Sequence, residues 1–140
     1  MIERLDHLVI AVNDLDAAVE SYTKLFGYGP SWRGVHEQLG TANALFPLDN
    51  TYLELLASDG NEGPGSAMIK ATLELNGEGL CGLVLGTSNI SDIKEHLTKH
   101  GTELQDLSLG EGVDNDQGLK RTWKNLFLPF SLTRGMFAFI

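Results

Sequence analysis

The chain has 140 residues, of which 42% are hydrophobic and 21% are charged, and these values are typical of one globular domain. Nineteen Asp and Glu against ten Lys and Arg give a formal net charge of -9, which opposes binding to nucleic acid or to an anionic membrane surface. No apolar stretch approaches the ~20 residues of a membrane span and no signal peptide is recognisable, so we expect a cytoplasmic protein. The single cysteine, Cys81, excludes an intrachain disulfide and a CxxC motif.

The first part of the chain predicts a strand, a helix and three more strands. Residues 5–12 are rich in β-branched side chains and predict a strand. Residues 15–26 place apolar side chains at helical spacing and end at Gly27, so they predict an amphipathic helix. Three strand-like segments follow, separated by short turns: 31–37, 41–48 and 51–57. Residues 1–57 are therefore predicted to form one βαβββ unit.

The second part of the chain repeats this pattern after a shift of 75 positions. A polar, glycine-rich linker at 58–66 leads into a short helix that Ser66 is expected to cap, and together they occupy residues 58–79. The second unit, residues 80–140, is expected to hold a strand at 80–86, a helix at 90–100, a polar turn at 110–118 and strands at 102–107, 119–128 and 135–140. Agreement of strand, cap, helix and terminal glycine makes a duplicated βαβββ unit the best interpretation.

Two such units predict an α+β fold, in which a curved mixed sheet surrounds a cleft and the helices lie outside. The first and last strands of each unit should line the cleft. Side chains alternate along a strand, so His7 shares a face with Val9, and Glu54 shares a face with Tyr52. We therefore expect His7 and Glu54 to meet across one hollow.

His7 and Glu54 are unusual residues for their apolar surroundings. A carboxylate flanked by leucines is costly to bury unless it is paired, protonated or bound to metal, so Glu54 is a candidate general base with a raised pKa. Two plainer alternatives stay open: His7 is a hydrogen-bonded histidine at a strand end, or Glu54 faces water.

The run DHLVIAVNDLDAAVESYTKLFG, the strand YLELL and the duplicated βαβββ order resemble the vicinal oxygen chelate superfamily, which includes glyoxalase I, methylmalonyl-CoA epimerase, extradiol dioxygenases and bleomycin-binding proteins. The segment GTANALFPLDNTYLELL is similar to glyoxalase-like domain proteins, and the segment from Ser66 to GEGL is similar to the epimerases. The resemblance implies a divalent metal held by one residue from the first and one from the last strand of each unit. It assigns His7 and Glu54 as two ligands, suited to zinc, cobalt, iron, manganese or nickel.

The second unit departs from this pattern. Gly82 aligns with His7 and Ala138 aligns with Glu54, and neither side chain can coordinate a metal. A family glutamate further along would lie beyond Ile140. The metal therefore takes ligands from elsewhere, a partner chain completes the site, or no metal binds.

Further candidates come from the polar and aromatic residues of other strands. His36, Thr41 and Asn43 are assigned as hydrogen-bonding residues for a polar substrate group. For His36 the alternatives are a replacement for a lost metal ligand and an exposed loop histidine. Tyr52 is assigned to substrate binding from its place beside Glu54.

The basic and aromatic segment around Trp123 is a second possible binding element. Arg121 and Trp123 are assigned to hold a carboxylate or phosphate of a ligand, and the alternative is that Trp123 belongs to the core.

The leading functional hypothesis is a glyoxalase-like protein that acts on a small oxygenated molecule by metal-assisted lyase, isomerase, epimerase or dioxygenase chemistry, with Glu54 as metal ligand or proton carrier. The alternative is a metal-independent small-molecule binder of the bleomycin-resistance type, for which a cationic ligand would suit the net charge. A third possibility is an interaction module with a filled cleft. Because relatives often pair, the resemblance also implies a homodimer.

Overall fold

The computed structural model describes all 140 residues, in eight strands and four helices with one 3-10 turn. In chain order these are β1 (Arg4–Ala11), α1 (Leu15–Phe26), β2 (Trp32–His36), η1 (Glu37–Leu39), β3 (Thr41–Pro47), β4 (Tyr52–Ser58), α2 (Pro64–Asn76), β5 (Gly79–Gly86), α3 (Ile90–Lys99), β6 (Ser108–Asp114), β7 (Lys120–Asn125), α4 (Phe130–Thr133) and β8 (Ala138–Phe139).

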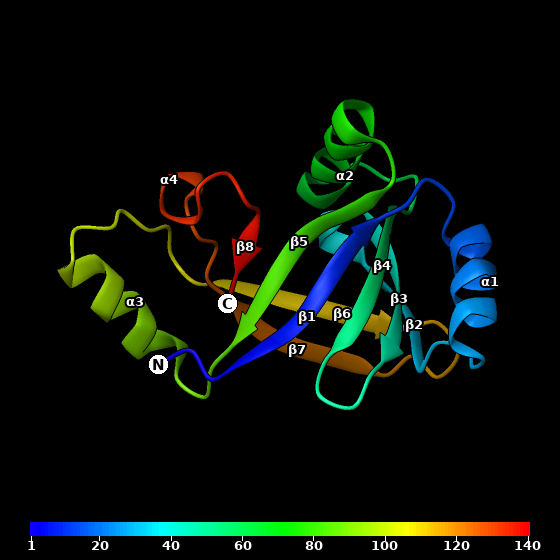
Figure 1. Ribbon diagram of the computed structural model, residues 1–140, viewed down its shortest axis with the longest axis horizontal. Coiled ribbons are helices and arrows are strands. Elements are labelled where there is room, and N and C mark those ends of the chain that lie inside the picture. The colour runs from blue at the N-terminus through cyan, green and yellow to red at the C-terminus, as the bar shows by residue number, and fades with distance from the viewer.

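The strands form one curved, nearly closed sheet in the order β7-β6-β2-β3-β4-β1-β5-β8 (Figure 1). In each half the first strand runs parallel to the last, because β1 pairs with β4 and β5 pairs with β8. The halves join through the antiparallel pairs β1–β5 and β2–β6. Backbone hydrogen bonds from Leu126 and Leu128 to Ile140 and Ala138 then bring the two ends of the sheet together. This arrangement confirms the predicted α+β fold of two βαβββ units around a cleft.

The register between β1 and β5 confirms the 75-residue repeat. His7 lies opposite Val84, and Val9 lies opposite Gly82. In the 75-residue repeat His7 corresponds to Gly82 and Val9 corresponds to Val84, so the two pairs are equivalent. An approximate two-fold axis that relates the strands therefore passes between Leu8 and Leu83. The division of the chain into units at residues 57 and 80 stays a prediction.

Helix α1 follows its sequence signals closely. The Asp14 side chain accepts a hydrogen bond from the amide of Ala17 at 3.0 Å, and Gly27 ends the helix in the left-handed conformation at φ 78°. The helix packs on the outer face of the first half, where Phe46 and Leu55 are fully buried. Helix α3 covers the outer face of the second half, where its Ile93 packs in one buried cluster with Leu126 and Ile140.

Helix α2 occupies a different position, because it closes one end of the sheet. Ile69 is fully buried against Val9, Leu56 and Val84, which come from β1, β4 and β5. Those side chains point inward, so the helix forms the floor at one end of the interior. None of the four helices is long and apolar enough to cross a lipid bilayer, the longest having 13 residues.

Two local predictions are wrong. Helix α2 begins at Pro64 after Gly63, so Ser66 does not cap it; Ser66 is buried and its hydroxyl lies 2.7 Å from that of Ser58. The strand expected at 102–107 lies instead at 108–114, where it overlaps the turn expected at 110–118. Strand β6 was missed because its glycines are typical of a turn. Gly110 is needed here because any side chain would collide with the indole ring of Trp123.

Candidate functional site

The curved sheet encloses a cleft of about 840 Å³. Its walls are the inward side chains of both halves, and the first turn of α2 lies at one end. A cleft of this size is suited to a small organic molecule. Tyr52, Glu54 and Leu56 of β4 line it together with His7 and Val9 of β1, in agreement with the predicted alternation of side chains.

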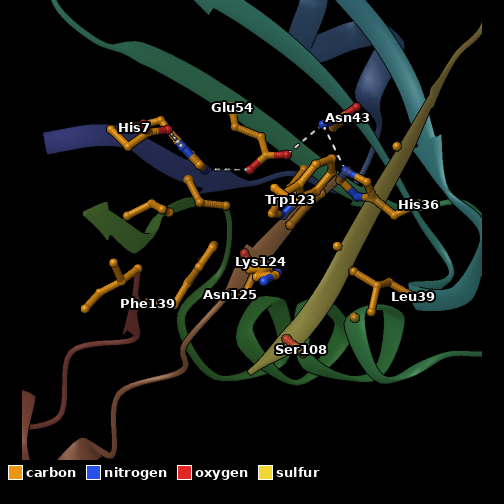
Figure 2. A pocket seen from close by; sticks show the side chains of 18 of the residues that line it. His7, His36, Leu39, Asn43, Glu54, Ser108, Trp123, Lys124, Asn125 and Phe139 are labelled. Carbon is orange, nitrogen blue, oxygen red and sulfur yellow. Dashed lines mark hydrogen bonds and ion pairs between the residues drawn. The ribbon is translucent and has the colours of Figure 1, made fainter. Parts of the chain in front are cut away.

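His7 and Glu54 meet inside this cleft (Figure 2). The Nε2 atom of His7 lies 3.3 Å from Oε2 of Glu54, and its Nδ1 lies 3.0 Å from Oδ1 of Asp6. The other oxygen of Glu54 accepts a hydrogen bond from the side-chain amide of Asn43 at 2.7 Å. Only 8% of His7 and 7% of Glu54 remain exposed. Every polar atom of this buried pair therefore has a partner. The alternative in which Glu54 faces water is wrong, whereas a hydrogen-bonded His7 with a purely structural role stays a second interpretation.

The surroundings of the pair favour the charged form of both side chains. Burial alone lowers the pKa of His7, but the carboxylates of Glu54 and Asp6 outweigh burial and raise this pKa above 6.5. Burial alone raises the pKa of Glu54, but His7, His36 and the Asn43 amide outweigh it and hold this pKa below 4.5. The prediction of a raised pKa for Glu54 is therefore wrong, because sequence shows the burial of a carboxylate and not its partners.

A second histidine extends the polar network. The Nε2 atom of His36 lies 3.4 Å from the Asn43 amide nitrogen, and its Nδ1 lies 3.0 Å from the Thr41 hydroxyl. His36 is buried, which excludes the exposed-loop alternative, and burial lowers its pKa despite the nearby charge of Glu54. Burial thus favours the neutral form of the His36 imidazole, and Asn43 links this ring to Glu54. The Oδ1 atom of Asn43 is buried without a hydrogen-bond partner.

Aromatic rings hold the His7 imidazole in place. The Tyr52 ring stacks on it with 4.4 Å between centroids, and the Phe139 ring meets it edge-on at 6.1 Å. Burial, then the charges of Glu54 and Asp6, raise the pKa of the Tyr52 hydroxyl, which therefore stays neutral. These contacts leave His7 little rotational freedom.

The structure corrects the alignment of the second unit. Val9 pairs with Glu54 in the first half, and Val84 pairs with Phe139 in the second, so Phe139 rather than Ala138 is the counterpart of Glu54. The two-residue strand β8 is too short for its register to be read from sequence. Phe139 lines the cleft, whereas Ala138 is 1% exposed in the core.

The other expected ligand position in the second half is filled by an aromatic ring. A Cβ atom at Gly82 would lie 3.0 Å from the Phe137 ring and 3.3 Å from Val9. A side chain at this position would require Phe137 to move. The first half therefore contributes His7 and Glu54 to the cleft. The equivalent positions of the second half are occupied by the rings of Phe137 and Phe139.

The side chains present do not fit the four-ligand metal site that the resemblance implies. Two neighbouring ligands of one ion lie ~3.0–3.4 Å apart, so His7 and Glu54 alone have a suitable spacing. However, Gly82 and Phe139 carry no donor, and no group of three His, Cys, Asp or Glu side chains in the structure could hold an ion. His36 does not replace a missing ligand in this geometry.

The wall opposite Glu54 is built by β7. Four steps separate β4 from β7 in either direction around the nearly closed sheet, so the two strands face each other across the cleft. The Arg121 guanidinium lies over the Trp32 ring at 4.4 Å, and Trp123 meets His36 edge-on at 5.8 Å. Trp123 is 38% exposed, so it is part of the cleft wall and not of the core.

Sequence reasoning missed one member of the polar network, Asp6. Strict alternation puts Asp6 on the face opposite to His7. The β1–β5 register shifts between Leu5 and His7, and this irregularity accompanies the contact of Asp6 with the neighbouring imidazole. The only signal in the sequence is the direct succession of Asp6 and His7.

Comparison with known proteins supports the fold assignment. A family model described as a glyoxalase-like domain matches residues 5–140. No curated protein sequence gives a significant match. Among solved structures, Streptomyces coelicolor methylmalonyl-CoA epimerase in complex with 2-nitronate-propionyl-CoA has 24% identity and a TM-score of 0.76, with 99% of this chain and 96% of that chain covered. The Mycobacterium tuberculosis epimerase has 20% identity and a TM-score of 0.77, with 99% and 86% covered. At these identities the likeness shows a shared fold.

Proposed function

Since this chain belongs to the glyoxalase-like domain family, we propose that it binds a small oxygenated molecule in the cleft and moves a proton at the carbon beside a carbonyl group, as an isomerase or epimerase. One observation carries the proposal: a buried His7–Glu54 ion pair lies on the cleft wall, with the contact between Nε2 and Oε2 at 3.3 Å. A cleft residue whose pKa is shifted by burial and by a specific charged partner is a candidate functional residue. Structures with this fold in complex with acyl-CoA compounds are consistent with such a ligand.

In this proposal Glu54 accepts the proton and His7 stabilises the resulting oxyanion. When the carbonyl oxygen of the ligand accepts the hydrogen bond from Nε2–H of His7, Glu54 loses its strongest partner. The pKa of Glu54 then rises toward that of a useful base. The C–H electron pair moves onto the carbonyl oxygen as Glu54 takes the proton. The imidazolium charge of His7 then faces the new negative charge. Return of the proton to the opposite face of the same carbon gives the epimer. In a 2-hydroxy ketone, its delivery to the former carbonyl carbon, with transfer of the hydroxyl proton to the oxyanion, gives the isomer.

The surrounding side chains orient this pair. Asp6 holds Nδ1 of His7 and stabilises its charge, as Tyr52 fixes the plane of the ring. Asn43 holds one oxygen of Glu54 and leaves the other toward His7. None of these roles requires a metal ion. This agrees with the second half, where Gly82 and Phe139 offer no side-chain ligand atom.

The test is proton exchange in D₂O, followed by NMR on a panel of 2-hydroxy ketones, 2-oxo acids and acyl thioesters. We expect loss of the acidic C–H signal of at least one compound, with a rate that falls ~10²–10⁴-fold in Glu54→Gln. Glu74→Gln removes an exposed carboxylate of α2 and should leave the rate unchanged. Exchange that requires added metal and stops with chelator would contradict the metal-independent form of the proposal.

The second candidate is binding without turnover. It is favoured by the phenylalanine side chains that take the two ligand positions of the second half, and by the complete pairing of the His7 and Glu54 polar atoms. Calorimetry on the same panel separates the candidates. A compound that binds tightly with chelator present, yet shows no exchange over days, would establish the binder and refute the reaction.

A further inference from the structure

Two positive charges on the cleft wall have no carboxylate partner. The cleft is lined by three carboxylates, and each is in an ion pair: Asp6 with Arg4 and His7, Glu54 with His7, and Glu111 with Lys120. Arg121 and Lys124 also line the cleft, and neither forms an ion pair. Other lysines and arginines of this chain also lack an ion pair, so Arg121 and Lys124 are distinguished by their place on the cleft wall.

Arg121 is an exposed side chain that stacks on an aromatic ring. Its guanidinium lies 4.4 Å above the centroid of the Trp32 ring, and the Trp32 ring is itself only 7% exposed. Gly34 leaves room for this ring, since a Cβ atom there would lie 2.6 Å from its Nε1. A guanidinium stacked on an aromatic face keeps its N–H edge free for a planar or tetrahedral anion.

The position of Arg121 relates it to the reacting pair. It lies on β7, which faces β4 across the sheet, and its charge is near enough to oppose the rise in the pKa of the Tyr52 hydroxyl. Tyr52 stacks on His7. Figure 2 shows Lys124 following Trp123 along β7, on the side of the cleft away from His7 and Glu54. An anionic group near these cations would leave the rest of a small ligand beside the polar pair.

We propose that the natural ligand is an organic anion, whose carboxylate or phosphate group binds Arg121 while its oxygenated carbon atoms face His7 and Glu54, with Lys124 adding positive charge at the edge of the cleft. This inference rests on the proposed use of the cleft for a small molecule, and it adds the class of the ligand. The net charge of -9 on the whole chain favours a cationic ligand, but the unpaired charges at the cleft are positive. The proposed anionic ligand is therefore the opposite of what net charge alone suggests.

The experiment uses three probes of similar size: benzoate, phenyl phosphate and the neutral benzyl alcohol. The chain has two tryptophans, Trp32 and Trp123, and both line the cleft. Two indole N–H signals in a ¹⁵N-labelled sample therefore report binding directly. We expect at least one anionic probe to shift them and to bind about tenfold more tightly than benzyl alcohol at low salt, because a charge-assisted hydrogen bond is replaced by a neutral contact.

Three variants locate the anion. Arg121→Gln should weaken the anionic probe about tenfold, and the exposed Lys124→Gln should weaken it about threefold. Lys70→Gln removes the same charge from an exposed residue of α2 outside the cleft, and it should leave the affinity within a factor of about two because salt screens distant charges. If Arg121→Gln fails to fold, Lys124→Gln decides the test, because its side chain is exposed and unpaired.

Each result either supports or overturns the proposal. Binding of benzoate alone identifies a carboxylic acid, binding of phenyl phosphate alone identifies a phosphate ester, and binding of both identifies an anion site. Equal affinity for benzyl alcohol, no shift with either anion, or equal losses in Lys124→Gln and Lys70→Gln would overturn it. Anion binding without proton exchange would refute only the proposed reaction, and exchange of neutral compounds without anion binding would refute only this inference.

Discussion

Replacement of Glu54 by glutamine tests the buried ion pair while preserving the shape of the side chain. Two opposite charges 3.3 Å apart attract by about 5 kcal/mol at an effective dielectric constant of ~20. Desolvation offsets part of this attraction, but removal of one partner leaves the other charge buried, and such changes typically cost ~3–5 kcal/mol. Glutamine can still accept the hydrogen bond from Asn43. We therefore expect Glu54→Gln to lower the free energy of unfolding by about 3 kcal/mol, and Tm by about 10 °C.

The pH dependence distinguishes an ion pair from simple packing. Glu54 has a lowered pKa in the folded protein, so it stabilises the fold above pH 4.5, and this contribution is lost as the pH falls through the folded-state value. His7 has a raised pKa, so its contribution is complete below pH 6.5 and is lost as the pH rises through its folded-state value. The difference between the wild-type protein and Glu54→Gln should be largest between pH 4.5 and 6.5 and should shrink at higher pH.

Urea denaturation followed by circular dichroism at several pH values measures this difference. Asp6→Asn is the matched control, because it removes a carboxylate from the other nitrogen of the same ring. The Asp6 side chain is 29% exposed, so this loss should be only about 0.5–1 kcal/mol. A pH-independent difference for Glu54→Gln, or equal costs for the two variants, would refute the assignment of a buried charged pair.

Three more outcomes are expected. An NMR titration of the four histidines should give His7 a pKa above 6.5 and His36 a pKa below it; the opposite order would contradict the network. Gly110→Ala should cost ~1–3 kcal/mol in chemical denaturation, because the new methyl group displaces the indole on the next strand, whereas Gly29→Ala meets no atom within 4 Å and should be near neutral. Asp14→Ala should lower Tm by an amount equivalent to about 1 kcal/mol through loss of the α1 cap, and an unchanged Tm would show that the cap contributes little.

The fold could be predicted where its signals are local. The limits of α1 follow from a capping aspartate and a terminal glycine, and the repeat at 75 residues follows from the apolar spacing of two strands and two helices. Strand β6 could not be predicted, because it contains glycines where most strands have larger side chains. These glycines make room for the indole of Trp123 on the neighbouring strand. Propensity records a glycine as a turn residue and carries no information on such a distant contact.

The candidate site shows the same division. Alternation along two strands was sufficient to bring His7 and Glu54 to one cleft, as the structure has them. The sign of the pKa shift of Glu54 was missed because it depends on partners from three other strands. The counterpart of Glu54 was misplaced by one residue, since β8 pairs over only two residues and its register is set by Leu83 and Val84.

The near closure of the sheet affects how the protein can associate. An open sheet exposes backbone donors and acceptors along its outermost strands, to which another chain can add a strand. Here β7 and β8, the outermost strands, are joined by hydrogen bonds between the segments 126–128 and 138–140. The outer edge of β7 keeps free backbone groups, because this strand pairs only with β6 and the closing hydrogen bonds begin at Leu126. Three basic side chains lie along this edge, Lys120, Arg121 and Lys124, and their charge opposes the addition of a strand from a second copy.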